Sequence, residues 1–130
     1  MIGVDKKLQQ SLPATIIGVE KTKNIYELAQ WYSCADVFVN PTYVDNFPTT
    51  NIEALSCGTP VITYSTGGSI EAADSHTGMI IQQGDVGELQ NAIYTMCNCE
   101  KPISACLHRA QLFNKDKCFQ EYIQLYESLL

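Results

Sequence analysis

Two short, β-branched apolar runs flank one helical segment, and together they constrain the fold more than any other feature of the chain. The first run is DVFVN at residues 36–40, and the second is PVITY at residues 60–64. Runs of this kind are typical of parallel strands that are buried on both faces. The helix between them is expected to begin at residues 48–50 and to end at Gly58. Strand, helix and strand make a βαβ crossover, which predicts an α/β protein.

The rest of the chain repeats this alternation of strands and helices. The prediction is a Rossmann-like parallel sheet of about five strands with helices on both faces, followed by C-terminal helices. A chain of 130 residues is expected to form a single domain. Further strands are expected at residues 2–4, 14–19 and 79–81, and helices at residues 6–11, 25–34, 70–73, 86–96 and, as two amphipathic helices broken near 114–117, within 103–130.

The loop at residues 41–50 falls where a ligand is expected. In open α/β sheets, ligands bind beyond the carboxyl ends of the strands. The helix that follows the loop points free N–H groups and the positive end of its dipole into the same crevice, which favours an anion. Gly67 and Gly68 follow the second strand and would let the backbone turn sharply or let a ligand approach closely. The region therefore predicts a site for a phosphate-bearing ligand.

Charge and hydropathy exclude some classes of partner. The net charge of −6 and the sequence pI of about 4.7 oppose a nucleic-acid backbone or an anionic membrane as the main partner. No apolar run approaches the roughly 18 residues of a transmembrane helix, and the first ten residues lack the pattern of a secretion signal. A cytoplasmic protein is the expectation.

Six cysteines are present, and they are interpreted as free thiols because the chain alternates strands and helices without a secretion signal. Cys34 and Cys57 fall at apolar helix positions. The C-terminal group contains no C-x-x-C pair and has only His108 near it, which favours buried thiols over a zinc site. No metal is expected. The C-terminal group consists of Cys97, Cys99, Cys106 and Cys118.

Asp45 and Glu53 are separated by seven residues, within the string DNFPTTNIEALSCGTPVI that starts at Asp45. This string resembles the Glu-x7-Glu region of retaining glycosyltransferases of the GT-B fold, the glycosyl transferases group 1 family. The flanks agree with the resemblance, which spans roughly residues 24–97 in one ordered chain of motifs. The flanking matches are YSCADVFV from Tyr32, TGGSIE from Thr66, and GMII through Gly84-Asp85.

The resemblance implies the C-terminal, donor-binding half of an enzyme that transfers a sugar from a UDP- or GDP-sugar, with retention at the anomeric carbon. It implies that Glu53 binds the ribose hydroxyls of the nucleotide and that Asp45 lies near the donor sugar as the catalytic residue. It implies no metal and no other cofactor, and a role in capsule, lipopolysaccharide or exopolysaccharide synthesis. The other donor-binding residues that it implies are Asn46, Phe47, Pro48, Thr49, Thr50, Gly67 and Gly68.

The same comparison implies that parts of a GT-B enzyme are missing. Ile2-Gly3-Val4 resembles the second strand of the family's C-terminal domain, so the first βα unit and the N-terminal acceptor domain are expected to be absent. The chain alone is then expected to have little or no transferase activity, and any peripheral membrane contact would come through the missing domain. Our hypothesis is that the sheet closes the gap, changes its order or borrows a strand from another copy.

Plainer interpretations stand beside these. Thr50 and Glu53 fit the T-x-x-E spacing of a capping box, and Asp45 suits an Asx turn. Both histidines are expected at the surface, and Trp31 and the tyrosines at helical spacing in the core. A non-catalytic nucleotide-binding or nucleotide-sugar-binding module, or an interface module, is the alternative function. A flavodoxin-like or receiver module is disfavoured because no phosphate-accepting Asp follows a strand.

Overall fold

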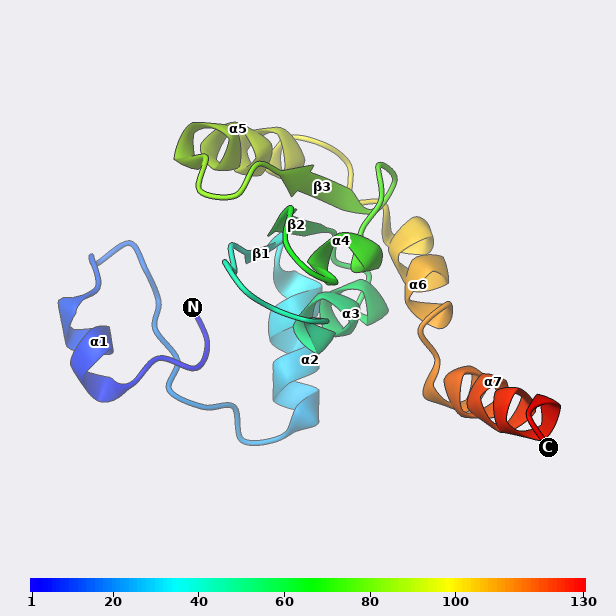
Figure 1. The fold of residues 1–130 in the computed structure, drawn as a ribbon. Coiled ribbons are helices and arrows are strands. Elements are labelled where there is room, and N and C mark those ends of the chain that lie inside the picture. The colour runs from blue at the N-terminus through cyan, green and yellow to red at the C-terminus, as the bar shows by residue number, and fades with distance from the viewer. The chain divides into compact units, whose positions relative to one another are not determined.

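The structure of the protein is a computed structural model that describes residues 1–130. The chain divides into two compact units, Met1–Trp31 and Tyr32–Leu130. Each unit is described by itself below, with the element labels of Figure 1. The expectation of a single domain over 1–130 stays a prediction.

The smaller unit holds little regular structure besides two helical segments. Helix α1 (Lys6–Ser11) begins at Asp5, whose side chain accepts a hydrogen bond from the Leu8 N–H at 2.7 Å. Most of helix α2 (Ile25–Cys34) also belongs to this unit, and the Asn24 side chain accepts two hydrogen bonds from its first N–H groups. Both helices have the predicted bounds.

The two strands predicted at residues 2–4 and 14–19 are wrong. Only a single parallel bridge between Ile2 and Val19 forms there. Gly3 has a φ of +83°, which interrupts an extended strand. Ile17 is 68% exposed, so the second run has no buried face to support a sheet.

The larger unit contains a parallel sheet of three strands, whereas about five were predicted. The strands are β1 (Phe38–Asn40), β2 (Val61–Tyr64) and β3 (Gly78–Ile81), in the order β1-β2-β3. Strand β2 lies in the centre and all four of its residues are buried, as its continuous apolar run predicts. In this sheet β1 pairs with β2 alone, so the hypothesis of a borrowed strand stays a prediction.

Helices cover both faces of the sheet, as predicted. Helix α3 (Thr49–Ser56) connects β1 to β2, helix α4 (Ser69–Ala72) connects β2 to β3, and helix α5 (Val86–Cys97) follows β3. Figure 1 shows α5 on one side of the sheet and α3 on the other. The core on the α5 side joins Ile62, Tyr64 and Ile81 to Ala92.

The helix signals in the sequence act as expected. Cys57 is the C-cap residue of α3, and Gly58 follows it with a φ of +75° and donates its N–H to the Leu55 carbonyl at 2.9 Å, as a glycine that ends a helix does. Asp85 starts α5 and accepts from the Glu88 N–H at 2.7 Å.

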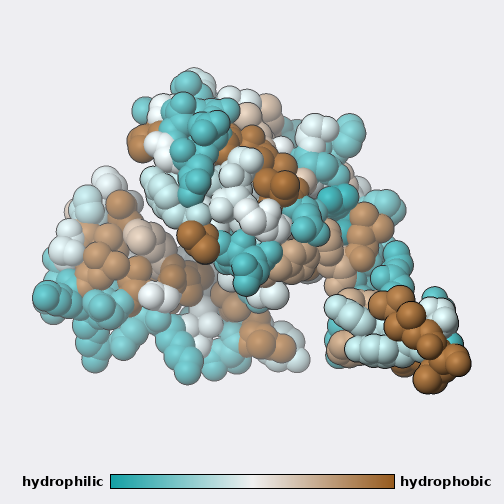
Figure 2. All heavy atoms as spheres, in the orientation of Figure 1, coloured by the Kyte–Doolittle hydropathy of each residue, from teal (hydrophilic) through white to brown (hydrophobic).

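Two C-terminal helices end the chain, α6 (Ile103–Gln111) and α7 (Lys115–Ser128). Helix α6 packs on α3. The apolar face predicted for α7 exists but is exposed, and Figure 2 shows hydrophobic side chains along this end of the chain. Among the tyrosines of the helices, Tyr32 is buried, and the expectation of core positions is wrong for Tyr26, Tyr94, Tyr122 and Tyr126, which are exposed.

Arg109 ties α6 to the end of α4. Its guanidinium donates to the Glu71 carbonyl at 2.6 Å and to the Ala72 carbonyl at 3.2 Å. It also lies 3.6 Å from the Asp74 carboxylate, and its guanidinium carbon lies 5.5 Å from the centre of the Phe113 ring. The Asp74 pair is partly exposed, so it contributes little compared with the two carbonyl bonds.

We expect Arg109→Ala to lower the free energy of unfolding by about 1–3 kcal/mol, because two carbonyl groups at the end of α4 lose a charged donor. Urea unfolding followed by circular dichroism measures the loss. His108→Ala is the matched control, since His108 is exposed and lies next to Arg109 on the same helix. Equal stability of the two variants would show that the Arg109 contacts contribute nothing.

Asp74 gives the stability of the larger unit a pH dependence. Partial burial opposes ionisation of Asp74, but bonds from the Thr77 hydroxyl and the His76 N–H, together with the Arg109 charge, lower its pKa below the ordinary 3.8. A carboxyl whose pKa is lower in the folded state stabilises the fold above its unfolded pKa. That contribution is lost as the pH falls through the folded pKa.

Wild type should therefore lose unfolding free energy more steeply than Asp74→Asn as the pH falls from about 5 to below 3.8, and the variant should be the less stable one at neutral pH. Urea unfolding of both proteins across this range measures the difference. Parallel curves for the two proteins would contradict the assignment to Asp74.

Candidate functional site

The start of helix α3 is open toward solvent. Pro48 is the N-cap residue, and no side chain caps the helix. The Asn51 N–H donates to the Pro48 carbonyl at 3.1 Å, and the N–H groups of Thr49 and Thr50 are left for solvent or a ligand. Thr49 and Thr50, which the sequence predicted in the site, are exposed in this turn, whereas Pro48 is buried.

Glu53 lies one turn further along α3 and is exposed. Its Oε2 accepts a hydrogen bond from the Tyr32 hydroxyl at 3.1 Å, and its Oε1 accepts none from the protein. The capping-box interpretation is wrong, because Pro48 rather than Thr50 caps the helix and because the carboxylate bonds to Tyr32.

Tyr32 is the neighbour of the site that the sequence did not reveal. Its side chain belongs to the last turns of α2, and the residue is 9% exposed. Burial and then the Glu53 charge raise the pKa of the phenol well above its usual 10, so its O–H stays a donor. The only sequence signal was the Tyr at the start of the YSCADVFV match.

Asp45 forms an Asx turn at the end of the loop that follows β1. Its Oδ1 accepts a hydrogen bond from the Phe47 N–H at 3.0 Å, which is the plainer interpretation of this residue. Oδ2 accepts no hydrogen bond from the protein. Asp45 therefore shapes its loop and keeps one carboxylate oxygen without a protein partner.

The loop after β2 packs against this turn, backbone on backbone. The Gly68 N–H donates to the Asn46 carbonyl at 2.9 Å. A Cβ on Gly67 would overlap the Asp45 carbonyl oxygen, and a Cβ on Gly68 would overlap that of Asn46. The close approach of the two backbones therefore requires both glycines. It brings the Gly67-Gly68 turn next to the loop at residues 41–50, the two segments predicted to form the site.

The carbonyl of Tyr43 collects donors from two further segments. It accepts from the Thr66 hydroxyl at 3.0 Å and from the Gln83 amide at 2.8 Å. The sequence did not indicate Tyr43, Thr66 or Gln83, because their bonds join residues far apart in the chain.

The Phe47 ring, at the other end of the same loop, lies 5.7 Å from the Phe113 ring, centre to centre.

Two buried polar groups lie in the first turns of the helices beside these loops. Asn51 of α3 is fully buried, and its Oδ1 accepts from the Asn40 amide at 2.9 Å while its own Nδ2 has no partner. The Ser69 hydroxyl of α4 is also buried without a partner. Unpartnered buried polar groups are uncommon in native proteins.

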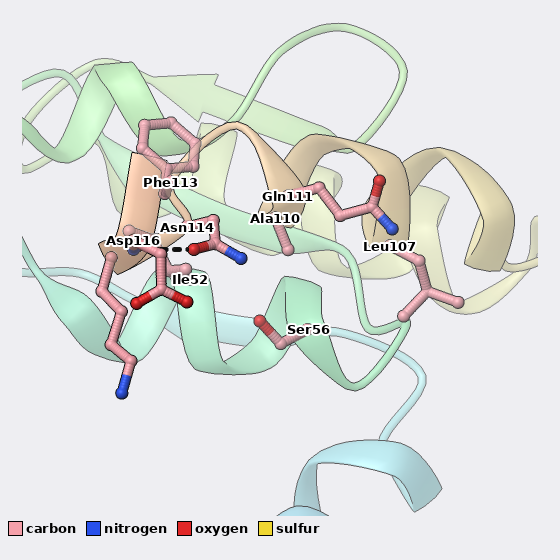
Figure 3. Close-up of a pocket in the computed structure, with 9 residues that line it drawn as sticks. Ile52, Ser56, Leu107, Ala110, Gln111, Phe113, Asn114 and Asp116 are labelled. Carbon is pink, nitrogen blue, oxygen red and sulfur yellow. Dashed lines mark hydrogen bonds between the residues drawn. The ribbon is translucent and has the colours of Figure 1, made fainter. Parts of the chain in front are cut away.

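A hollow of about 440 Å³ lies elsewhere on α3, between α3 and the junction of α6 with α7 (Figure 3). Figure 3 shows side chains from both sides facing this space. It contains none of the residues predicted to bind the donor, so we do not assign the donor to it. Its lining comprises Ile52, Ser56, Leu107, Ala110, Gln111, Phe113, Asn114, Lys115 and Asp116.

The cysteines are all free, as expected, but the expectation of buried thiols holds only for Cys106. Burial raises the pKa of the Cys106 thiol to about 11, so it stays protonated. Cys57 is half-buried, and the remaining four are exposed. The structure brings no three His, Cys, Asp or Glu side chains into an arrangement that could hold a metal ion.

The comparisons with known proteins agree with this architecture. Residues 1–99 match the family described as "Glycosyl transferases group 1". The chain belongs to this family. Its fold is that of the C-terminal domain of a GT-B glycosyltransferase.

Particular relatives point the same way. The chain is 30% identical over 105 residues to a D-inositol 3-phosphate glycosyltransferase of Streptomyces bingchenggensis, covering 77% of this chain and 23% of the relative. It is 36% identical over 81 residues to D-inositol 3-phosphate glycosyltransferase 2 of Catenulispora acidiphila, covering 62% and 19%. The solved structure of sucrose-phosphate synthase from Thermosynechococcus elongatus superposes with a TM-score of 0.79 and 32% identity, covering 95% of this chain and 33% of that one. The chain thus spans about a quarter of the length of the relatives it matches.

We expect Gly68→Ala to push the two site loops apart, because the new methyl group would overlap the Asn46 carbonyl oxygen. Gly68 has an ordinary φ of −78°, so the substitution tests the clash and not the conformation. The expected loss of unfolding free energy is about 1–3 kcal/mol, measured by urea unfolding.

Gly87→Ala is the matched control. Its added Cβ meets only the Asp85 side chain, at 3.4 Å, and Ala in place of Gly in a helix is expected to be neutral or to stabilise it by up to about 1 kcal/mol. If Gly68→Ala were as stable as this control, the close backbone approach would not restrict the residue at position 68.

Proposed function

We propose that the Tyr32–Leu130 unit binds a nucleotide-sugar donor, a UDP- or GDP-sugar, for a retaining glycosyltransferase. One observation carries the proposal: Glu53 is exposed, with one carboxylate oxygen engaged by Tyr32 and the other unengaged, one turn from a helix start that no side chain caps. A carboxylate that can accept hydrogen bonds from two hydroxyls suits ribose, and a free helix start suits a diphosphate.

The roles of the other residues follow from their places around Glu53. Asp45 is proposed as the catalytic residue near the donor sugar, since its Oδ2 is unengaged and its loop is held by backbone bonds. The uncapped N–H groups of α3 would meet phosphate oxygens or sugar hydroxyls. The residues proposed to shape the donor pocket are Asn46, Phe47, Pro48, Thr49, Thr50, Gly67 and Gly68.

The helix start also suits the chemistry of transfer. When the bond between sugar and diphosphate breaks, the departing nucleoside diphosphate gains negative charge. The N–H groups and dipole at the start of α3 are fixed before the reaction, so they stabilise this charge without reorganising. In the proposed reaction the acceptor attacks from the face that the nucleotide leaves, with the leaving phosphate accepting the proton of the acceptor hydroxyl, and no metal takes part.

The acceptor belongs to the longer protein. The acceptor domain expected from the sequence is proposed to close over the donor, and the chain alone is proposed to be inactive. The relatives reported above are named for D-inositol 3-phosphate and sucrose-phosphate, so a role in polysaccharide synthesis stays a prediction without support from their names. None of the helices has the length and apolar character needed to cross a membrane. A cytoplasmic location remains part of the proposal.

A non-catalytic binding or interface module is the second candidate, and the placement of basic side chains favours it. Lys101 donates to the carbonyls of Ser33 and Ala35, and Arg109 to those at the end of α4. These two cations of the larger unit therefore bind backbone carbonyls. The other two, Lys115 and Lys117, lie on α7, so a catalytic donor site would depend on them or on basic residues from outside this unit to neutralise the diphosphate.

Glu53→Gln tests the donor site by titration calorimetry with UDP, GDP and their sugars. We expect wild type to bind one nucleotide series and the variant to bind it about 10- to 100-fold more weakly, because hydrogen bonds to a charged acceptor are lost. Glu121→Gln is the control, because Glu121 lies on the exposed face of α7 and its substitution removes the same charge.

No binding by wild type would contradict a competent donor site in this chain. Equal binding by wild type and Glu53→Gln would contradict the ribose assignment and leave the diphosphate contact at α3 as the source of affinity.

A further inference from the structure

The Tyr32 hydroxyl is the only protein donor on the Glu53 carboxylate. The Oη–Oε2 distance is 3.1 Å, and the two residues are 21 positions apart in the chain. Glu53 is exposed, and a free glutamate side chain at the surface samples several rotamers. A hydrogen bond to one oxygen restricts those rotamers before any ligand arrives.

Tyr32 can act in this way because three contacts hold it. Its ring packs edge-on against the Phe38 ring of β1, with centres 5.3 Å apart and an interplanar angle of 76°. Its backbone carbonyl accepts from the Thr59 hydroxyl at 2.6 Å and from the Ala35 N–H at 3.1 Å. The phenol is therefore fixed to the sheet and to the turn that leads from α3 into β2.

The bond leaves the carboxylate with spare accepting capacity. Oε2 keeps a second lone pair, and Oε1 accepts nothing from the protein. Because the phenol remains protonated, it keeps the O–H that donates to Oε2. The orientation that Tyr32 imposes is thus compatible with two incoming hydroxyl donors.

We propose that Tyr32 is a positioning residue that holds the Glu53 carboxylate in the orientation that accepts the 2′- and 3′-hydroxyls of a ribose. The inference rests on the proposed donor site. The inference gives Tyr32 a part in distinguishing ribonucleotides from deoxyribonucleotides, because only the ribose hydroxyls bond to the Glu53 carboxylate and depend on its orientation.

Tyr32→Phe tests this assignment, since it removes the hydroxyl and keeps the ring that packs on Phe38. Calorimetry would give the dissociation constants of UDP, GDP and their 2′,3′-dideoxy counterparts, which carry neither hydroxyl and serve as the deoxyribonucleotides in this test, for wild type and variant. We expect Tyr32→Phe to weaken ribonucleotide binding about 3- to 10-fold and to leave deoxyribonucleotide binding unchanged. Tyr26→Phe, on the same helix and 75% exposed, should leave both unchanged.

A double variant separates positioning from general damage. If Tyr32 acts only through Glu53, Tyr32→Phe with Glu53→Gln should bind ribonucleotides no more weakly than Glu53→Gln alone. A Tyr32→Phe protein with lower thermal stability remains informative, because deoxyribonucleotide binding reports whether the site is folded at the temperature of measurement.

The outcomes distinguish this inference from the proposed function. A wild type that shows no preference for ribonucleotides overturns both. A wild type with the preference, and a Tyr32→Phe protein that retains it in full, overturns the role of Tyr32 alone. An equal loss for both kinds of nucleotide also overturns it, because that result describes a structural tyrosine.

Discussion

The burial of β2 on both faces is the constraint on which the larger unit depends. The strand pairs with β1 on one side and β3 on the other, and all four of its residues are buried. Because all three strands are parallel, their carboxyl ends lie at one edge, and the loops that follow them meet there. The Tyr43 carbonyl, which accepts from the loop after β2 and from the loop after β3, is the point where all three loops join.

The meeting of these loops explains why glycines, which have no side chain, stand where the loop after β2 comes closest to the loop after β1. The Gly68 N–H reaches the Asn46 carbonyl at 2.9 Å, and a Cβ on either glycine of the second loop would overlap the first loop. Backbone bonds between loops hold their geometry more firmly than long side chains would, since fewer rotamers must be ordered. The resulting frame holds the Asx turn of Asp45 and leads directly into the open start of α3.

Most of the larger unit could be predicted from the sequence because its signals are local. Gly58 ends α3, Asp85 starts α5, and continuous apolar runs mark the buried strands. The strands predicted at residues 2–4 and 14–19 failed because a β-branched run becomes a strand only where a partner and a buried face exist, and neither can be read from a short run. The apolar face of α7 is exposed for a similar reason. Helical periodicity in the sequence shows that one face of a helix is apolar, but it does not show which element covers that face.

The site shows the same division between local and distant information. Spacing identified Glu53, but the local T-x-x-E rule assigned it to a cap that the structure gives to Pro48. Its actual partner, Tyr32, lies 21 residues away in the chain, and only the folded structure shows their hydrogen bond. A phenol that is only 9% exposed needs an acceptor, and leaving it without one costs about 1–3 kcal/mol, so stability alone would keep the pair together. That cost is the same whichever nucleotide binds, whereas an oriented carboxylate favours only ligands that carry the hydroxyls. The bond between Tyr32 and Glu53 therefore has a stabilising role and an orienting role. Comparing ligands with and without the hydroxyls distinguishes the two, whereas measuring stability does not.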